Sequence, residues 1–345
     1  MKKKSDTAAL IGLFLLFIFL AEVGAGEITD MSGRRVIVPD AITKVYCASP
    51  PATYMLYALD PALIAGLNYP FNPREKPYLN PSVAKLPVIG GWFGQGRTPN
   101  QEALLQIRPD IMIVWKWKNS AVNDKIEQTA RQLKLPLVYI RIDHLSDYAK
   151  AFQFMGSLLH REKRARELSD YAVNALKSVE SAISDIPDEK KVSVYYAEAP
   201  DGLSTECDKS VHAELIPLAG GKNIHQCEAE DDFGMVRVTI EQVMRNNPDV
   251  IIAQEKSFAD QVFGNPIWKS IRAVKNRRVH LIPKYPFNWF DRPPSFMRLL
   301  GIQWLTNLLY PDRYAFDLSK ETKAFYKLFL GVEVDDRGLE EVLQK

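Results

Sequence analysis

The feature that most constrains this 345-residue sequence is an internal repeat. Thr98 to Trp115 reads TPNQEALLQIRPDIMIVW, and Thr239 to Ala253 reads TIEQVMRNNPDVIIA. The two stretches align without a gap, which places Glu102 on Glu241. Each copy predicts a short helix that stops before a proline and then a continuous apolar strand, as in a buried parallel sheet. The chain is therefore expected to consist of two similar halves, the alternative being two unrelated segments that share a common pattern.

Strands and helices alternate in both halves, which predicts an α/β fold with parallel sheets and right-handed crossovers. Apolar residues recur at helical spacing from Lys163 to Ile183, so one helix about 30 Å long is expected to bridge the halves. An ordinary helix inside one domain is the alternative. The predicted organisation is an N-terminal lobe over 27–145, a helical segment over 146–188 and a C-terminal lobe over 189–345, with a ligand cleft between the lobes. Six strands are expected at Val45–Ala48, Ile111–Trp115, Leu137–Ile142, Val192–Ala197, Val250–Ala253 and Val279–Leu281.

Residues 1–26 have the composition of a secretory signal peptide. Lys2 to Lys4 are basic, Ala8 to Leu20 are apolar, and small residues at Val23 to Ala25 offer a cleavage site near Ala25 and Gly26. An uncleaved membrane anchor is the alternative, although the apolar run is short for a full span. The expected location of the mature protein is the periplasm.

Export to an oxidising compartment would allow the cysteines to form a disulfide. In an oxidising compartment Cys207 and Cys227, which flank a helix-sized segment, are expected to form a disulfide, whereas Cys47 lies in an apolar strand. The alternative is metal ligation with His212 or His225, but no close Cys/His spacing supports a metal site. The formal net charge of +2 shows no basic stripe, so nucleic acid is not an expected partner.

Ligands of parallel α/β sheets bind beyond the carboxyl ends of the strands, and those ends are aromatic here. Four tryptophans and Phe93 fall at predicted strand ends or loops, which favours a flat or partly apolar ligand over simple packing against loops. Asp291 could instead cap the helix expected over Ser295–Leu309, and Arg292 could bind a ligand carboxylate, phosphate or carbonyl oxygen. The sequence contains no Gly-x-Ser-x-Gly, HExxH or phosphate-binding loop, so neither catalytic residues nor a cofactor are predicted.

Taken together, the exported start, ITDMSGRRVIVP, the Ser-Pro-Pro turn, PNQEALLQIRPDIMIVW, the bridging helix and NWFDRPPS resemble the periplasmic binding proteins for cobalamin, ferric siderophores and haem. The resemblance covers essentially the whole mature chain. It implies two Rossmann-like lobes joined by one long helix, and a monomeric receptor that delivers its ligand to an ATP-driven importer. It also implies that Glu102 and Glu241 dock against arginines of a two-fold permease dimer.

The resemblance implies ligand contacts as well. Corrinoid or ferric siderophore is favoured; haem, a small nickel or cobalt chelate, and an oxyanion such as molybdate remain alternatives. Haem would use Tyr54, Tyr69 or His212 as an axial ligand. A chelatase-like enzyme and a membrane-tethered sensor or scavenger without a permease are the competing functions. The expected ligand-binding residues are Pro50, Tyr69, Trp92, Phe93, Arg97, Trp115, Trp117, Arg237, Trp289, Asp291 and Arg292.

Overall fold

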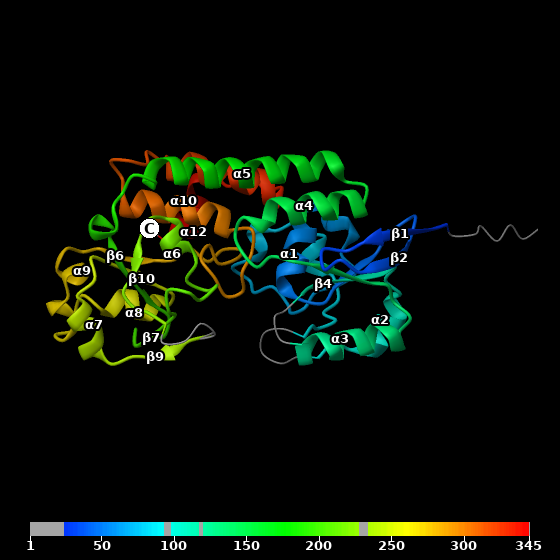
Figure 1. The fold of residues 1–345 in the computed structure, drawn as a ribbon, viewed down its shortest axis with the longest axis horizontal. Coiled ribbons are helices and arrows are strands. Elements are labelled where there is room, and N and C mark those ends of the chain that lie inside the picture. The colour runs from blue at the N-terminus through cyan, green and yellow to red at the C-terminus, as the bar shows by residue number, and fades with distance from the viewer. Residues whose placement is uncertain (1–23, 93–97, 117–119, 228–233, 345) are drawn as a thin grey trace, which may run out of the picture.

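The computed structural model describes residues 24–92, 98–116, 120–227 and 234–344. They form two α/β lobes lying side by side beneath a long helix, α5 (Glu162–Ile183), which runs along the top of the molecule in Figure 1. The predicted contacts at Phe93, Arg97 and Trp117 lie outside the described residues. Within the described ranges, no helix has both the length and the apolar character needed to cross a membrane.

The N-terminal lobe is built on a parallel sheet with strand order β3-β4-β5, formed by Val45–Cys47, Ile111–Trp115 and Leu137–Ile140. An antiparallel hairpin, β1 (Ala25–Thr29) with β2 (Arg35–Pro39), precedes it. The helices of this lobe are α1 (Pro50–Leu59), α2 (Gln101–Ile107), α3 (Ser120–Gln132) and α4 (Asp147–Leu158), with short 3-10 turns at Pro61–Leu63, Lys76–Tyr78 and Val83–Lys85.

The C-terminal lobe repeats this plan with a parallel sheet of order β11-β10-β6-β8. Its strands are Val279–Leu281, Val250–Ala253, Ser193–Ala197 and Lys222–Asn223 respectively, and a small antiparallel pair, β7 (Ser204–Thr205) with β9 (Val236–Arg237), lies beside them. Its helices are α6 (Leu215–Leu218), α7 (Ile240–Asn246), α8 (Lys256–Gln261), α9 (Arg272–Lys275), α10 (Arg298–Leu309), α11 (Leu318–Phe325) and α12 (Asp336–Leu343). Asp188–Lys190 and Trp268–Ser270 are 3-10 turns, and Tyr326–Leu330 is a π-helical turn.

The internal repeat is preserved in the hydrogen bonding of the two lobes. Helices α2 and α7 each span seven residues and each ends in a left-handed residue, at Arg108 and Asn247. The aspartate that follows each helix caps the neighbouring strand: Asp110 accepts the Lys44 N–H at 2.8 Å, and Asp249 accepts the Ser193 N–H at 3.1 Å. The prediction of two similar α/β halves is therefore confirmed, with α2 and α7 both on the side of the molecule away from α5 in Figure 1.

The alternation of side chains along the strands divides the core. Ile111 and Ile113 of β4 belong to one large buried cluster, whereas Met112 and Val114 point to a smaller one on the opposite face of the sheet. The large cluster also contains residues of β6, β10 and helices α1, α4, α5, α10 and α11, so it is continuous from one lobe to the other. The carboxy-terminal segment contributes to this continuity, because the Tyr57 hydroxyl of α1 donates to the Leu330 carbonyl at 2.9 Å.

The helix expected over Ser295–Leu309 begins three residues late, at Arg298, and the nearby helix α6 is only four residues long. Before each start the backbone forms three-residue turns: the Ala213 N–H bonds the Ser210 carbonyl at 3.0 Å, and the Arg298 N–H bonds the Ser295 carbonyl at 3.2 Å. These turns carry side chains of the candidate site.

Candidate functional site

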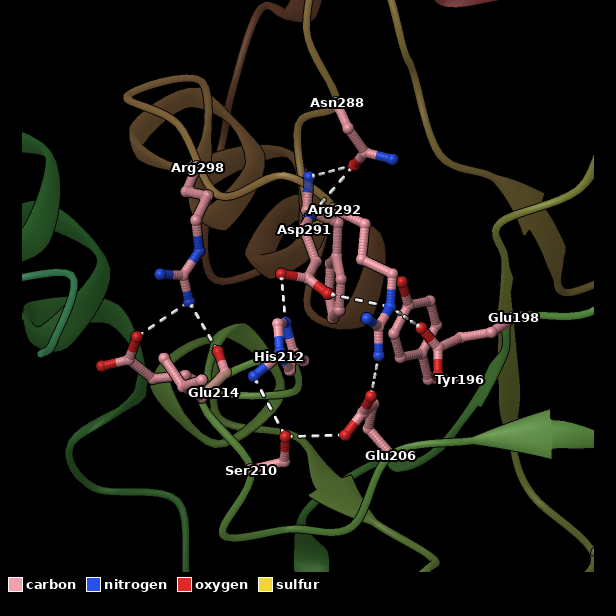
Figure 2. A network of polar contacts seen from close by, with 12 residues as sticks. Tyr196, Glu198, Glu206, Ser210, His212, Glu214, Asn288, Asp291, Arg292 and Arg298 are labelled. Atoms are coloured by element: carbon pink, nitrogen blue, oxygen red, sulfur yellow. Dashed lines mark hydrogen bonds and ion pairs between the residues drawn. The ribbon is translucent and has the colours of Figure 1, made fainter. Parts of the chain in front are cut away.

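The candidate site is a polar network at the carboxyl ends of the strands of the C-terminal lobe. Glu198 directly follows β6 and Glu206 directly follows β7. The segment from β11 to α10 returns over these ends and brings Asp291 and Arg292 to them, as Figure 2 shows. The site therefore lies where parallel α/β folds bind their ligands. We call Glu198, Glu206, His212, Asp291 and Arg292 the carboxylate cluster.

Arg292 lies at the centre of the carboxylate cluster. Its Nε donates to Glu198 Oε1 at 2.6 Å, its Nη2 donates to Glu206 Oε1, and its Nε lies 3.4 Å from Asp291 Oδ2. The side chains of all three carboxylates are fully buried, whereas that of Arg292 keeps 29% of its surface exposed. One guanidinium thus faces three buried carboxylates, and such charges are costly to bury unless they are compensated.

The pKa values reflect this crowding. Burial raises the pKa of Glu198 from 4.5 to about 7, because desolvation outweighs the opposing effect of Arg292. The pKa of Arg292 moves further above its ordinary value: burial works against its charge, but Asp291, Glu198 and Glu206 more than offset that. The guanidinium therefore stays charged, while the Glu198 carboxyl is close to half protonated at neutral pH.

His212 joins the cluster through a hydrogen bond to Asp291. Its Nδ1 lies 2.7 Å from Asp291 Oδ1, and its side chain is 12% exposed. The backbone that carries Asp291 is held in turn by Asn288, whose Oδ1 accepts the N–H groups of Phe290 at 2.7 Å and Asp291 at 3.0 Å. Asp291 is thus positioned by hydrogen bonds of its own, as are the carboxylates of imidazole–carboxylate pairs found in functional sites.

The same segment contacts the N-terminal lobe. The ring of Phe287 stacks on that of Tyr54 with centroids 3.9 Å apart, and the Tyr285 hydroxyl accepts from Arg74 Nη1 at 3.3 Å. A second contact between the lobes involves Glu214, whose carboxylate accepts hydrogen bonds from the Leu145 N–H at 3.1 Å and from Arg298 Nη2 at 2.8 Å. The carboxylate cluster is consequently next to contacts that join the two lobes.

The other residues predicted to bind ligand are not gathered at one place. Trp289 is fully buried, and Trp115 is 7% exposed at the end of β4. Trp92 is half-buried and lines a hollow formed with residues of α2 and α3, including Gln101 and Gln128. Pro50 is buried at the start of α1, and Tyr69 is half-buried with its hydroxyl 2.5 Å from that of Tyr54. Arg237 is exposed and pairs with Asp201 at 2.7 Å.

The alternative role considered for Asp291, as the cap of the following helix, is wrong. Helix α10 begins seven residues later, and Asp291 bonds His212 instead. Sequence reasoning missed Glu206, Ser210, Asn288 and Arg298 altogether. Ser210 Oγ donates to Glu206 Oε2 at 2.7 Å, but both residues stand in loops with no regular pattern. The one available signal was the position of Glu206 directly before Cys207.

The structure joins Cys207 and Cys227 with an S–S distance of 1.98 Å and Cα atoms 5.0 Å apart. Asp208 lies beside the two sulfur atoms, but bonded sulfurs are not available as thiolate ligands. The disulfide ties the loop that carries Glu206 to the segment after β8. It closes a loop spanning a sequence separation of 20, which contributes on the order of 3 kcal/mol to stability.

Comparison with known proteins identifies the class of molecule. Residues 78–286 match the family model described as periplasmic binding protein. This chain belongs to that family. An ABC transporter solute binding protein from Sulfurospirillum deleyianum shares its fold with a TM-score of 0.85 at 36% identity, covering 92% of this chain and 99% of that one.

Two further relatives carry names that state a ligand. The molybdate-binding protein MolA of Haemophilus influenzae is 26% identical over 95% of this chain and 97% of its own length. The high-affinity heme uptake system protein IsdE of Staphylococcus aureus is 25% identical over 56% of this chain and 67% of its own length. This periplasmic binding protein is therefore a solute-binding receptor of an ABC importer, and its relatives are transport proteins, not enzymes.

Proposed function

We propose that this receptor is exported by its first 26 residues, captures a metal-containing complex between its lobes and presents it to a two-fold permease through Glu102 and Glu241. Corrinoid and ferric siderophore are the favoured ligands. The relatives support a metal-containing solute, since one is named for molybdate and another for haem uptake. Tyr69 is half-buried beside the buried Tyr54–Phe287 stack where the lobes touch, and its ring suits contact with a ligand that has a large flat surface.

The observation that carries the docking proposal is the equivalence of the two glutamates. Glu102 and Glu241 are exposed at the second position of helices α2 and α7, which lie on the same side of the molecule. Three residues later each helix exposes an apolar side chain, Leu105 at 58% and Met244 at 41%. Two equal acidic and apolar contacts on one face suit a partner with two equivalent basic sockets.

Charge reversal tests the docking. Cells that depend on this receptor should lose uptake of its solute when Glu102→Arg and Glu241→Arg are combined, because each socket would then face a like charge. Each single variant should lose part of the uptake. Glu162→Arg is the matched control, since Glu162 is exposed in the first turn of α5 on the opposite side of the molecule.

Solute binding by the purified double variant should equal that of the unaltered protein. Unchanged uptake by the double variant would contradict docking through these helices. Titration of the purified protein with cobalamin, a ferric siderophore panel and haemin then identifies the ligand class. Saturable one-to-one binding of one of them is the expected result.

A further inference from the structure

The carboxylate cluster carries more negative than positive charge. Glu198, Glu206 and Asp291 supply three carboxylates, and Arg292 supplies one guanidinium. Because Glu198 is close to half protonated at neutral pH, the three carboxyl groups and Arg292 together carry a formal charge between −1 and −2. Because three of these side chains are fully buried, water compensates the surplus poorly, and a cation brought next to the cluster would be attracted strongly.

Two oxygen atoms within the cluster have unused capacity. Glu198 Oε2 and Asp291 Oδ2 are buried, and neither has a hydrogen-bond partner among the described residues. Glu198 is 3% exposed and Asp291 is fully buried. Asp291 Oδ2 still faces Arg292 Nε at 3.4 Å, whereas Glu198 Oε2 has neither a hydrogen bond nor an ion pair among the described residues. A buried carboxylate oxygen is normally paired, so Glu198 Oε2 needs an explanation, and a bound positive charge nearby supplies one.

Arg292 is poorly placed to bind an anion. Its guanidinium already contacts the carboxyl groups of Glu198, Glu206 and Asp291, which together compensate its single positive charge. A tetrahedral oxyanion or an anionic chelate entering here would meet the surplus negative charge of the cluster and no uncommitted cation of its own. Like-charge contacts of this kind exclude wrong ligands.

His212 gives the cluster a nitrogen atom that can bind a metal. Its Nδ1 faces Asp291 Oδ1 at 2.7 Å, which favours the tautomer with the proton on Nδ1 and the lone pair on Nε2. No hydrogen bond to Nε2 occurs within the described part of the chain, and the ring keeps some exposure. A carboxylate that holds Nδ1–H is the usual support of a histidine that binds metal through Nε2.

We propose, on the premise that the chain is a solute receptor, that it selects a complex with a positively charged, coordinatively accessible metal centre, which binds His212 Nε2 while Asp291 positions the ring. Glu198 and Glu206 supply the surplus negative charge that attracts this cation and repels oxyanions. The solute is therefore of the class of a cationic corrinoid or a divalent metal chelate. Asp291 and Arg292 support the site from behind and do not contact the solute.

The test uses the full mature protein and three probes: aquocobinamide, which is a cationic corrinoid with exchangeable axial water, Ni²⁺ alone, and molybdate. The protein should bind one or both cations with one-to-one saturation, and an imidazole replacing the axial water should shift the cobalt absorption bands. Molybdate should show no saturable binding at the same concentrations. His212→Gln should abolish the spectral shift and weaken binding about tenfold or more, and Asp291→Asn should weaken binding about tenfold.

His144→Gln is the matched control, because His144 is 73% exposed and contacts Glu214 rather than the cluster. The His144→Gln variant should bind the same cations as the unaltered protein, with the same affinity. Equal binding by the His212→Gln variant, saturable binding of molybdate, or binding of neither cation would each overturn the proposal. A failed ligand proposal can be distinguished from a failed receptor function by co-purification with the importer. Docking through Glu102 and Glu241 does not require His212, so the His212→Gln variant should still co-purify with the importer.

Discussion

At the scale of single residues, Glu198 is unusual because it is a buried carboxyl group whose pKa changes on folding. Glu198 is 3% exposed, and burial raises its pKa to about 7 in spite of its bond to Arg292. The folded state therefore holds this proton more tightly than the unfolded chain does. Its stabilising contribution is complete below about pH 4.5 and is lost as pH rises through about 7, which is the reverse of an ordinary paired carboxylate.

Glu198→Gln should remove this pH dependence, because the amide cannot ionise and its oxygen still accepts from Arg292. Relative to the unaltered protein, the variant should gain on the order of 3 kcal/mol in free energy of unfolding between about pH 4.5 and 7.5. Denaturant unfolding at a series of pH values measures the difference. Glu162 is exposed, so the free energy of unfolding of the Glu162→Gln variant should depend on pH as that of the unaltered protein does. The same pH dependence in the Glu198→Gln variant would contradict a raised pKa for Glu198.

At the scale of elements, the segment that carries the site is held by a close approach to helix α10. A Cβ atom added at Gly301 would lie 1.8 Å from the Trp289 carbonyl oxygen, two residues before Asp291. Gly301→Ala must therefore displace either the helix or the segment. We expect a loss of about 3 kcal/mol in stability and a weaker affinity for the solute.

Denaturant unfolding and a solute titration on the same preparation check both effects of Gly301→Ala. Gly264→Ala is the control, because a Cβ there would meet only the Gln261 carbonyl oxygen at an ordinary 3.5 Å. If the two variants unfold at the same denaturant concentration, the close approach at Gly301 does not constrain the segment.

The elements also show how far sequence reasoning reached. The strand expected at Ile111–Trp115 is β4, and the helix expected over Lys163–Ile183 lies within α5. Both were predictable because periodic apolar patterns encode local structure and burial. The carboxylate cluster was not, because its contacts join positions far apart in loops: His212 to Asp291 spans 79 positions, and Arg292 to Glu198 spans 94. Only the fold brings them together.

At the scale of the whole molecule, the two lobes share one core. Helix α5 spans 22 residues, about 33 Å, and its Leu168, Ala172 and Val179 belong to the buried cluster that also includes residues of both sheets. Separating the lobes would expose part of this cluster to water, at about 25 cal/mol for each Å² of apolar surface. A wide hinge opening is therefore disfavoured, and a small adjustment around the site is not.

Spin-label distances between the lobes should consequently change little when solute binds. Labels at Lys125→Cys on α3 and Lys256→Cys on α8, both exposed, report the separation of the lobes. We expect their mean distance in the free and loaded protein to differ by about 2 Å or less, as in receptors whose sites are largely formed before binding. Labels at Lys163→Cys and Lys177→Cys on α5 provide a fixed reference, because both sites lie on one helix.

A change between the lobes several times larger than that of the reference pair would mean that the shared core opens on binding. The solute would then be captured by hinge closure, and a rigid α5 would no longer account for the motion.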